Sequence, residues 1–246
     1  MDELKFGSFY IDGQPEFSML CPDLRSRYTA NIAFGNTVEG REMPWVKLGD
    51  LFVATKCACT GISWSDLNER GYIFGYPVQI DGRFYLCRSL QVGTAKDCPN
   101  EWNDCLDTYG DSESFWNWNK LFWGQETSKG NYAERIVRGM QTARARSAFS
   151  STTRAASIGF RPVLEPLDPM PEDISCFIGK CVWIYGPQGS RACGVLTSID
   201  DYDLVLGEAS GPFPIGGSQW IRTEGATATM AKSSMVWIKE KQKHGT

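Results

Sequence analysis

A proline-rich stretch two thirds of the way along the chain restricts the fold most strongly. Between Arg161 and Pro171 four of the ten positions from 162 onward are proline. Each proline removes a backbone donor and fixes φ, so this stretch favours an extended connector. The sequence therefore predicts a larger domain over residues 1–165, a linker over 166–171 and a smaller domain over 172–246.

The composition indicates a folded protein with few helices. The 246 residues are 42% hydrophobic and 13% aromatic, which is enough to build a buried core. The 25 glycines and 12 prolines favour a turn-rich β or α+β protein. The net charge of −4 argues against binding a nucleic acid polymer through overall charge. We find no signal peptide and no apolar run long enough for a membrane span, and expect synthesis in the cytoplasm.

Most hydrolytic chemistry is excluded because the chain has one histidine, His244, near its C-terminal end. A Ser-His-Asp or Cys-His unit needs an imidazole held beside the nucleophile, and a fraying terminus does not hold one. The nine cysteines are odd in number and show no paired Cys-x-x-Cys spacing, so we predict neither a complete disulfide framework nor a zinc site. We therefore predict no enzymatic activity, no metal and no cofactor.

An acidic run leaves two alternatives to that prediction open. Asp104, Asp107 or Asp111 would have to supply any remaining carboxylate or metal chemistry. Asp107, Asp111 and Glu113 offer oxygens for calcium, although hard cations need six or more in fixed geometry.

The smaller domain consists of short apolar runs separated by turn residues. Gly186–Gly189 and Gly211–Gly217 are the clearest breaks. The runs predict a small β-barrel of the SH3-like or OB type that serves packing or homo-oligomerisation. The predicted strands are Cys181–Tyr185, Cys193–Thr197, Asp203–Leu206, Gln219–Arg222 and Met235–Ile238.

The larger domain contains local signals for hairpins and one short helix. Asp81-Gly82 lies between alternating apolar runs and predicts a tight hairpin, and Asp12-Gly13 is a weaker copy. Residues 99–106 predict a helix with Trp102, Cys105 and Leu106 on one face. The aromatic cluster that follows holds Trp116, Trp118 and Trp123, which either stack on a ligand ring or belong to the core.

The segment from 135 to 161 contains six arginines and no acidic residue or lysine. In a chain of net negative charge this asymmetry indicates a local role, because the guanidinium fork suits phosphates and carboxylates. Arg135, Arg138 and Arg161 flank the segment, and we expect them to hydrogen-bond loop carbonyls. Arg144, Arg146 and Arg154 are the candidates for ligand contact, with a solvated surface role as the alternative.

The order of several elements resembles a known family. Pro99-Asn-Glu-Trp102, Trp123-Gly124, Arg135-Ile-Val-Arg-Gly139, Arg146-Ser-Ala148 and Ile158-Gly-Phe-Arg161 occur in sequence. They resemble the formylglycine-generating-enzyme-like branch of the C-type lectin fold. That resemblance implies an α+β class, with a C-type-lectin-like domain followed by the small β-barrel. Those enzymes use cysteines in this region, whereas no cysteine lies between Cys105 and Cys176 here, so formylglycine formation is excluded.

The chain is most similar to a non-enzymatic branch, the variable proteins of diversity-generating retroelements. The resemblance implies a phage or mobile-element protein, with association with the virion as one possibility, that presents an exposed ligand-binding loop face. The implied face over 141–157 consists of Gln141, Thr142, Arg144, Arg146, Phe149, Ser150, Ser151, Thr152, Thr153, Arg154 and Ser157.

Two hypotheses for the ligand follow from this resemblance and from the arginines. In the first, the face displays variable side chains to a receptor or glycan. In the second, the protein is an intracellular phage sponge that sequesters an anionic small molecule of the nucleotide type used in immune signalling. The second hypothesis makes Arg144 and Arg154 essential to binding.

Overall fold

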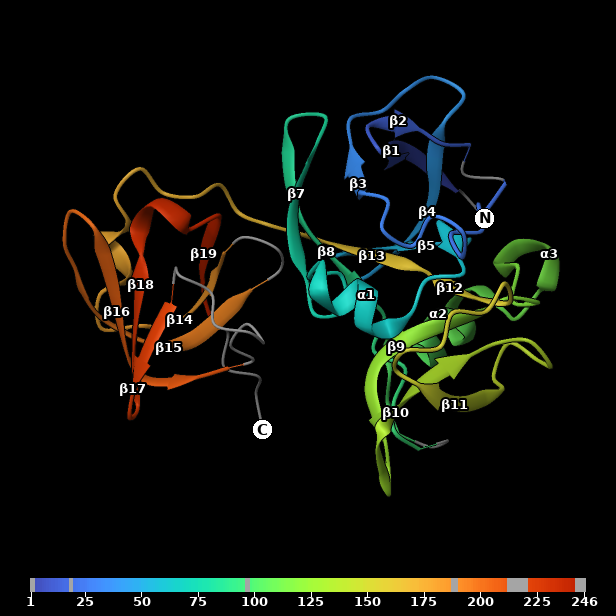
Figure 1. Cartoon of the computed structure of the whole chain (residues 1–246). Coiled ribbons are helices and arrows are strands. Elements are labelled where there is room, and N and C mark those ends of the chain that lie inside the picture. Colours follow the sequence, from blue (N-terminus) through green and yellow to red (C-terminus); the bar gives the residue numbers. More distant parts are fainter. Residues whose placement is uncertain (1–2, 18–19, 96–97, 187–189, 212–220, 242–246) are drawn as a thin grey trace. The chain divides into compact units, whose positions relative to one another are not determined.

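The computed structural model describes residues 3–17, 20–95, 98–186, 190–211 and 221–241 (Figure 1). The chain divides into two compact units, Met1–Leu167 and Asp168–Thr246. The division falls inside the proline-rich stretch. No helix among the described residues is long and apolar enough to cross a membrane.

The predicted α+β class is wrong, because the fold is predominantly β. Strands account for 47% of the described residues and helices for 12%. The helices are short: α1 is Trp64–Glu69, α2 is Glu101–Tyr109 and α3 is Glu113–Trp116. Frequent glycine and proline turns leave most connections too short for a longer helix.

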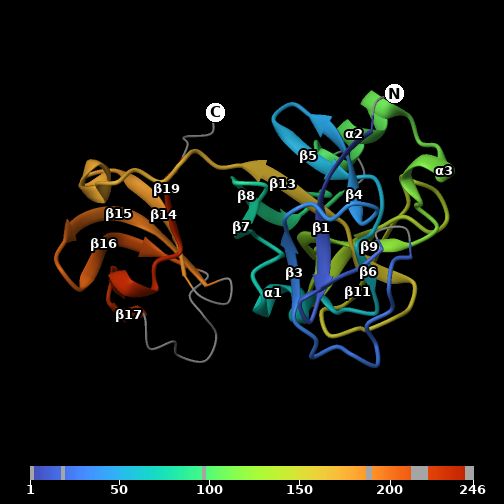
Figure 2. The same cartoon turned by 90° about the horizontal axis from the view of Figure 1, so that it is seen from above.

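The larger unit contains an eight-stranded sheet with the order β2-β1-β4-β5-β13-β8-β7, and β3 also pairs with β1 (Figures 1 and 2). All pairs in this sheet are antiparallel. The strands are β1 (Leu4–Ile11), β2 (Gln14–Pro15), β3 (Ile32–Gly35), β4 (Glu42–Leu48), β5 (Leu51–Ala54), β7 (Tyr76–Ile80), β8 (Arg83–Ser89) and β13 (Pro162–Pro166).

Both predicted hairpins in this sheet are confirmed. Asp81 and Gly82 join β7 to β8 with φ of 50° and 78°, and Asp12 and Gly13 join β1 to β2 with φ of 51° and 77°. Positive φ at both central positions is what a type I′ turn requires.

The proline-rich stretch begins inside the sheet rather than as a connector. Strand β13 lies between β5 and β8, with Val163 and Leu164 fully buried. Its two prolines occupy the first and last positions of the strand, where a missing donor disturbs the ladder least. Only the part after Leu167 lies outside the larger unit.

A second sheet of five strands has the order β11-β10-β9-β12-β6. Its strands are β6 (Cys59–Thr60), β9 (Leu121–Ser128), β10 (Asn131–Arg138), β11 (Arg146–Ser150) and β12 (Ile158–Phe160). Helix α2 confirms the helix predicted near residues 99–106. Its N-cap Asn100 accepts a hydrogen bond from the Asn103 amide, and Trp102, Cys105 and Leu106 are buried.

A buried arginine joins the two sheets and the helical region. Arg161 is 0% exposed and lies between β12 and β13. Its guanidinium donates to the carbonyl oxygens of Ala54, at 2.8 Å, and Trp116, at 2.5 Å. The guanidinium carbon Cζ of Arg161 lies 4.8 Å from the centroid of the Phe122 ring. No ion pair to Arg161 is found in the described part of the chain, and burial lowers its pKa.

The smaller unit is one antiparallel sheet with the order β17-β18-β16-β15-β14-β19. Its core includes Val182, Ile184, Leu196, Leu206 and Ile238. The strands are β14 (Cys181–Tyr185), β15 (Arg191–Ile199), β16 (Asp203–Ser210), β17 (Ile221–Glu224), β18 (Thr227–Ala231) and β19 (Trp237–Glu240), with 3-10 turns at Ile174–Phe177 and Lys232–Ser234.

The strand predictions for this unit are largely confirmed, while the closed barrel is not. β14 matches its predicted bounds, but β18 is not predicted, because its inward-facing residues are only Ala228 and Met230 and give a weak apolar signal. Within the described residues no pairing between the edge strands β17 and β19 closes the sheet. Gln219 and most of the two predicted breaks lie outside the described residues.

We predict that replacing Arg161 lowers the free energy of unfolding by about 2–4 kcal/mol, because two buried carbonyl oxygens lose their donors. Arg161→Met and Arg161→Lys should both be destabilised, since lysine lacks the planar fork that reaches both oxygens. Urea unfolding followed by tryptophan fluorescence measures the effect. Arg83→Met, at an exposed position, is the matched control and should change stability by under about 0.5 kcal/mol. A loss for Arg161→Met no larger than the control's would contradict this role.

Candidate ligand-binding face

The segment predicted to bind ligand wraps around the edge strand β11. A loop over 139–145 joins β10 to β11, and a turn over 151–157 leads to β12. Gly139 has φ of 106°, and a Cβ there would lie 2.6 Å from the Lys120 carbonyl oxygen, so the loop needs glycine at its start. β11 spans four residue steps, or about 14 Å. The structure therefore divides the predicted face into two separate patches.

The buried Arg138 and the half-buried Arg135 hold the start of this segment by bonding to backbone carbonyls, as expected. Arg138 is 2% exposed and donates to the Val92 carbonyl at 3.1 Å and to Asn103 Oδ1 at 2.6 Å. Arg135 donates to the Tyr132 carbonyl at 2.6 Å, and its guanidinium lies 4.3 Å from the ring of Trp64. These contacts fix the backbone of β10 and leave the following loop at the surface.

The first patch, defined as Gln141, Thr142, Arg144 and Arg146, is exposed at all four positions. Arg144 reaches Asp107 of α2 at 2.6 Å, with 46% and 68% of the two side chains exposed. Such an exposed pair contributes little to stability. Arg146 donates to the Thr94 carbonyl oxygen at 2.5 Å. The first patch therefore presents two exposed guanidinium groups, one bonded to an exposed carboxylate and the other to a backbone carbonyl.

Positive charge is concentrated at the first patch. Arg146 lies directly opposite Arg138 across the β10–β11 pair, an arrangement of like charges that is unfavourable in isolation. Burial, and then the charges of Arg146 and Arg144, lower the pKa of Arg138 to about 10. Glu126 opposes this effect. In the described part of the chain, Arg146 has no carboxylate within ion-pair distance.

The second patch, defined as the turn Ser150–Ser157, is built into the fold more firmly. The Ser151 carbonyl accepts from the Ser65 amide at 2.9 Å, and the Ser157 carbonyl accepts from the Leu121 amide at 2.8 Å. Ser150 and Thr152 are exposed and share a hydroxyl contact of 3.1 Å. Ser151, Thr153 and Ser157 are half-buried, and so is Phe149, which packs against the larger core.

Arg154 of the second patch has a structural partner that the sequence did not reveal. Its Nε and Nη2 donate to Asp66 at 2.8 and 2.7 Å, and its guanidinium lies 4.3 Å from the ring of Tyr28. Asp66 is 6% exposed and closes the capping box of α1 with Ser63. Burial raises the pKa of Asp66, but the bonds from Arg154 and Ser63 outweigh it and the net pKa is lowered.

Two of the three predicted tryptophans have no surface to offer a ligand. Trp116 and Trp123 are both 0% exposed, and their indole N–H groups donate to the carbonyls of Gly110 and Ile62. Both belong to the core and expose no surface on the predicted face. Trp118 is half-buried and donates to the Asp111 carbonyl at 2.9 Å.

The acidic run does not gather into a cation site. No group of three or more His, Cys, Asp or Glu side chains within the described ranges is placed to hold a metal ion.

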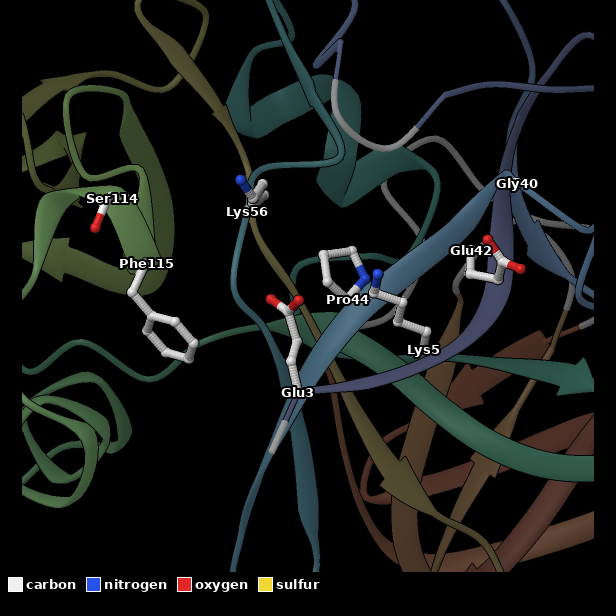
Figure 3. Close-up of a pocket in the computed structure, with 8 residues that line it drawn as sticks. All are labelled: Glu3, Lys5, Gly40, Glu42, Pro44, Lys56, Ser114 and Phe115. Atoms are coloured by element: carbon white, nitrogen blue, oxygen red, sulfur yellow. The ribbon is translucent and has the colours of Figure 1, made fainter. Parts of the chain in front are cut away.

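The clearest hollow lies away from both patches, beside Lys56 (Figure 3). Its volume is about 450 Å³, with Ser114 and Phe115 of α3 on one side and residues of β1 and β4 on the other. The lining residues are Glu3, Lys5, Gly40, Glu42, Pro44, Lys56, Ser114 and Phe115. A second, more open hollow shares Lys56 and Ser114. These hollows could not be predicted from the sequence, because their walls come from four distant segments.

We predict that Arg154→Ala lowers the free energy of unfolding by about 1–2 kcal/mol, because it removes both bonds to a buried carboxylate. Arg144→Ala, which removes an exposed ion pair, should cost under about 0.5 kcal/mol. Urea unfolding of the two variants beside the wild type gives the comparison. Equal losses would show that Arg154 is no more structural than Arg144.

We also predict a pH dependence carried by Asp66. Because its pKa is lowered in the fold, ionised Asp66 stabilises the protein above its unfolded pKa of about 4, and this contribution is lost as pH falls through the folded value. The stability gap between wild type and Asp66→Asn should therefore be widest above about pH 5 and narrow toward pH 2. Urea unfolding across this range measures it. A gap that stays constant with pH would rule out the carboxylate's charge as the cause.

Comparison with known proteins does not identify a family for the chain. No protein-family model, curated protein or solved structure matches the chain. The relationship to C-type-lectin-like variable proteins is neither supported nor contradicted by these comparisons, and it stays a prediction from the motifs between Pro99 and Arg161.

Proposed function

We propose that the larger unit is a non-catalytic ligand-binding domain that recognises an anionic group through the first patch. The observation that carries the proposal is the placement of Arg146 opposite Arg138, with Arg144 in the intervening loop. Like charges held together without a matching set of carboxylates are stabilised when an anion joins them. Gln141 and Thr142 add hydrogen-bonding groups at the same exposed loop.

A rigid base supports a binding role for this loop. Arg138 and Arg161 fix the backbone at the two ends of the segment through buried hydrogen bonds. The side chains at 141, 142, 144 and 146 point into solvent and take little part in the core. Substitutions there are therefore expected to change recognition more than folding.

The resemblance to variable proteins extends this proposal. It adds a phage or mobile-element origin, association with a virion, and a receptor or acidic glycan as the ligand. The alternative is the intracellular sponge for a nucleotide-type signal. The exposed guanidinium groups of Arg144 and Arg146 favour it, since they suit phosphate. Arg154, which that hypothesis also used, is already paired with Asp66.

Two probe sets separate these ligands. The purified chain is applied to an array of neutral, carboxylated and phosphorylated glycans. In parallel it is incubated with small-molecule extracts of phage-infected and uninfected bacteria, washed, denatured and examined by mass spectrometry. Retention on acidic glycans indicates the display face, and a stoichiometric, unmodified nucleotide indicates the sponge. Retention of neither kind of anion would overturn the proposal.

We predict that the double replacement of Arg144 and Arg146 by alanine weakens binding of the retained anion tenfold or more, since each charge-assisted bond contributes about 1.5–3 kcal/mol. Isothermal titration with the identified compound measures the change. The matched control replaces the exposed Arg83 and Lys129 by alanine, which removes the same charge elsewhere. If both double variants bind alike, net charge rather than the first patch is responsible.

A further inference from the structure

Two thiols lie side by side in the smaller unit. Cys181 of β14 and Cys193 of β15 have their sulfur atoms 4.0 Å apart. In the strand register Cys181 faces Val195 and Cys193 faces Trp183, so the two cysteines are diagonal neighbours on one face of the sheet. No second sulfur–sulfur hydrogen bond occurs among the residues that the structure describes.

The two thiols differ in access to solvent. Cys181 is exposed, whereas Cys193 is 2% exposed. Burial, and then the neighbouring Cys181, raise the pKa of Cys193, while a hydrogen bond and the charge of Lys241 lower it. A solvent-borne oxidant therefore meets Cys181 first, and the Cys193 thiol lies directly behind it. This is the arrangement of an attacking and a resolving cysteine.

The other seven cysteines lack one or both of these properties. Cys98 is half-buried, and its sulfur contacts the Thr94 hydroxyl at 3.9 Å. Cys57, Cys59, Cys87 and Cys105 are buried, and burial raises the pKa of each. Cys21 is half-buried, and burial followed by the neighbouring Cys57 raises its pKa to about 12. Cys176 is exposed but has no sulfur within hydrogen-bond distance in the described part of the chain. It is therefore the natural internal control.

We propose that Cys181 and Cys193 are a reversible oxidation site that forms a disulfide between β14 and β15 in the presence of a peroxide. The Cys181 thiolate attacks one peroxide oxygen, which breaks the O–O bond and gives a Cys181 sulfenic acid and hydroxide. The Cys193 sulfur then attacks the Cys181 sulfur, forming the S–S bond and releasing water. The two thiols are oxidised by two electrons in total and the peroxide is reduced by two. Two molecules of a low-molecular-weight thiol then reduce the Cys181–Cys193 disulfide to two thiols by exchange and are themselves oxidised to a disulfide.

This site does not depend on the proposed function, because both cysteines lie in the smaller unit and the first patch lies in the larger one. A disulfide framework was not expected from the sequence, and a single reversible pair is consistent with that expectation. Cytosolic disulfides, where they occur, are mostly transient and redox-sensing.

The sequence allows a direct test by digestion. Lys180, Arg191 and Arg222 place the two cysteines in separate tryptic peptides, 181–191 and 192–222. The full-length reduced chain is treated with hydrogen peroxide, denatured in the presence of N-ethylmaleimide, and digested without reduction. We expect seven alkylated thiols in place of nine, and a cross-linked pair of these two peptides that dithiothreitol separates.

Variants make the assignment specific. Cys176→Ser should form the cross-link as the wild type does, whereas Cys181→Ser should lose it and leave Cys193 alkylated. Cys193→Ser should leave a sulfenic acid at Cys181 that dimedone labels. Nine alkylated thiols after peroxide, or a cross-link from Cys176 instead, would overturn the proposal. Because the wild-type cross-link is mapped directly, the result does not depend on whether Cys193→Ser folds.

Discussion

The buried guanidinium of Arg161 organises the larger unit. It donates to the carbonyls of Ala54, in the eight-stranded sheet, and Trp116, in α3, while its own position lies between β12 and β13. The first sheet, the second sheet and the helical region therefore share one donor group. Because a buried cation without a carboxylate is costly, it persists only where all its surroundings are fixed. The rings of Trp102 and Phe122 pack against it, while its buried Nε has no hydrogen-bond partner among the described residues.

Because buried contacts hold the backbone, exposed side chains of the first patch can be replaced with little effect on the fold. The backbone of the 139–157 segment is tied at Arg138, at Gly139 and at Arg161, so the exposed side chains of the first patch are not needed to hold its ends. The first patch has few contacts with the core, whereas the second patch is bonded to α1 through Arg154 and Asp66. Of the two, the first patch is freer to change its side chains without loss of the fold.

Local features of the sequence predicted local structure well. The Asp-Gly hairpins and the Asn100-capped helix depend on neighbouring residues, and both are present. The class was wrong because it came from a resemblance, while the helices that the residues themselves support are short. The proline pattern places the start of the linker at Pro166, which is the last residue of β13, since nothing nearby in the sequence reveals that Val163 and Leu164 pair with two distant strands. Burial of Trp116 and Trp123 also depends on distant elements.

At the candidate site too, the charge pattern of the sequence does not reveal which distant residues each arginine contacts. Six arginines and no acid in one segment suggested a single cationic face, yet the fold assigns them different tasks. Arg135, Arg138 and Arg161 bond to backbone carbonyls, and Arg154 meets Asp66, a residue 88 positions away in the sequence. Arg154 is exposed but bonded to the buried Asp66, whereas Arg144 and Arg146 are exposed and bond to an exposed carboxylate and a backbone carbonyl. The proposed anion-binding role therefore rests on two side chains, and the buried charge of Arg138 beside them adds to the positive potential at the first patch.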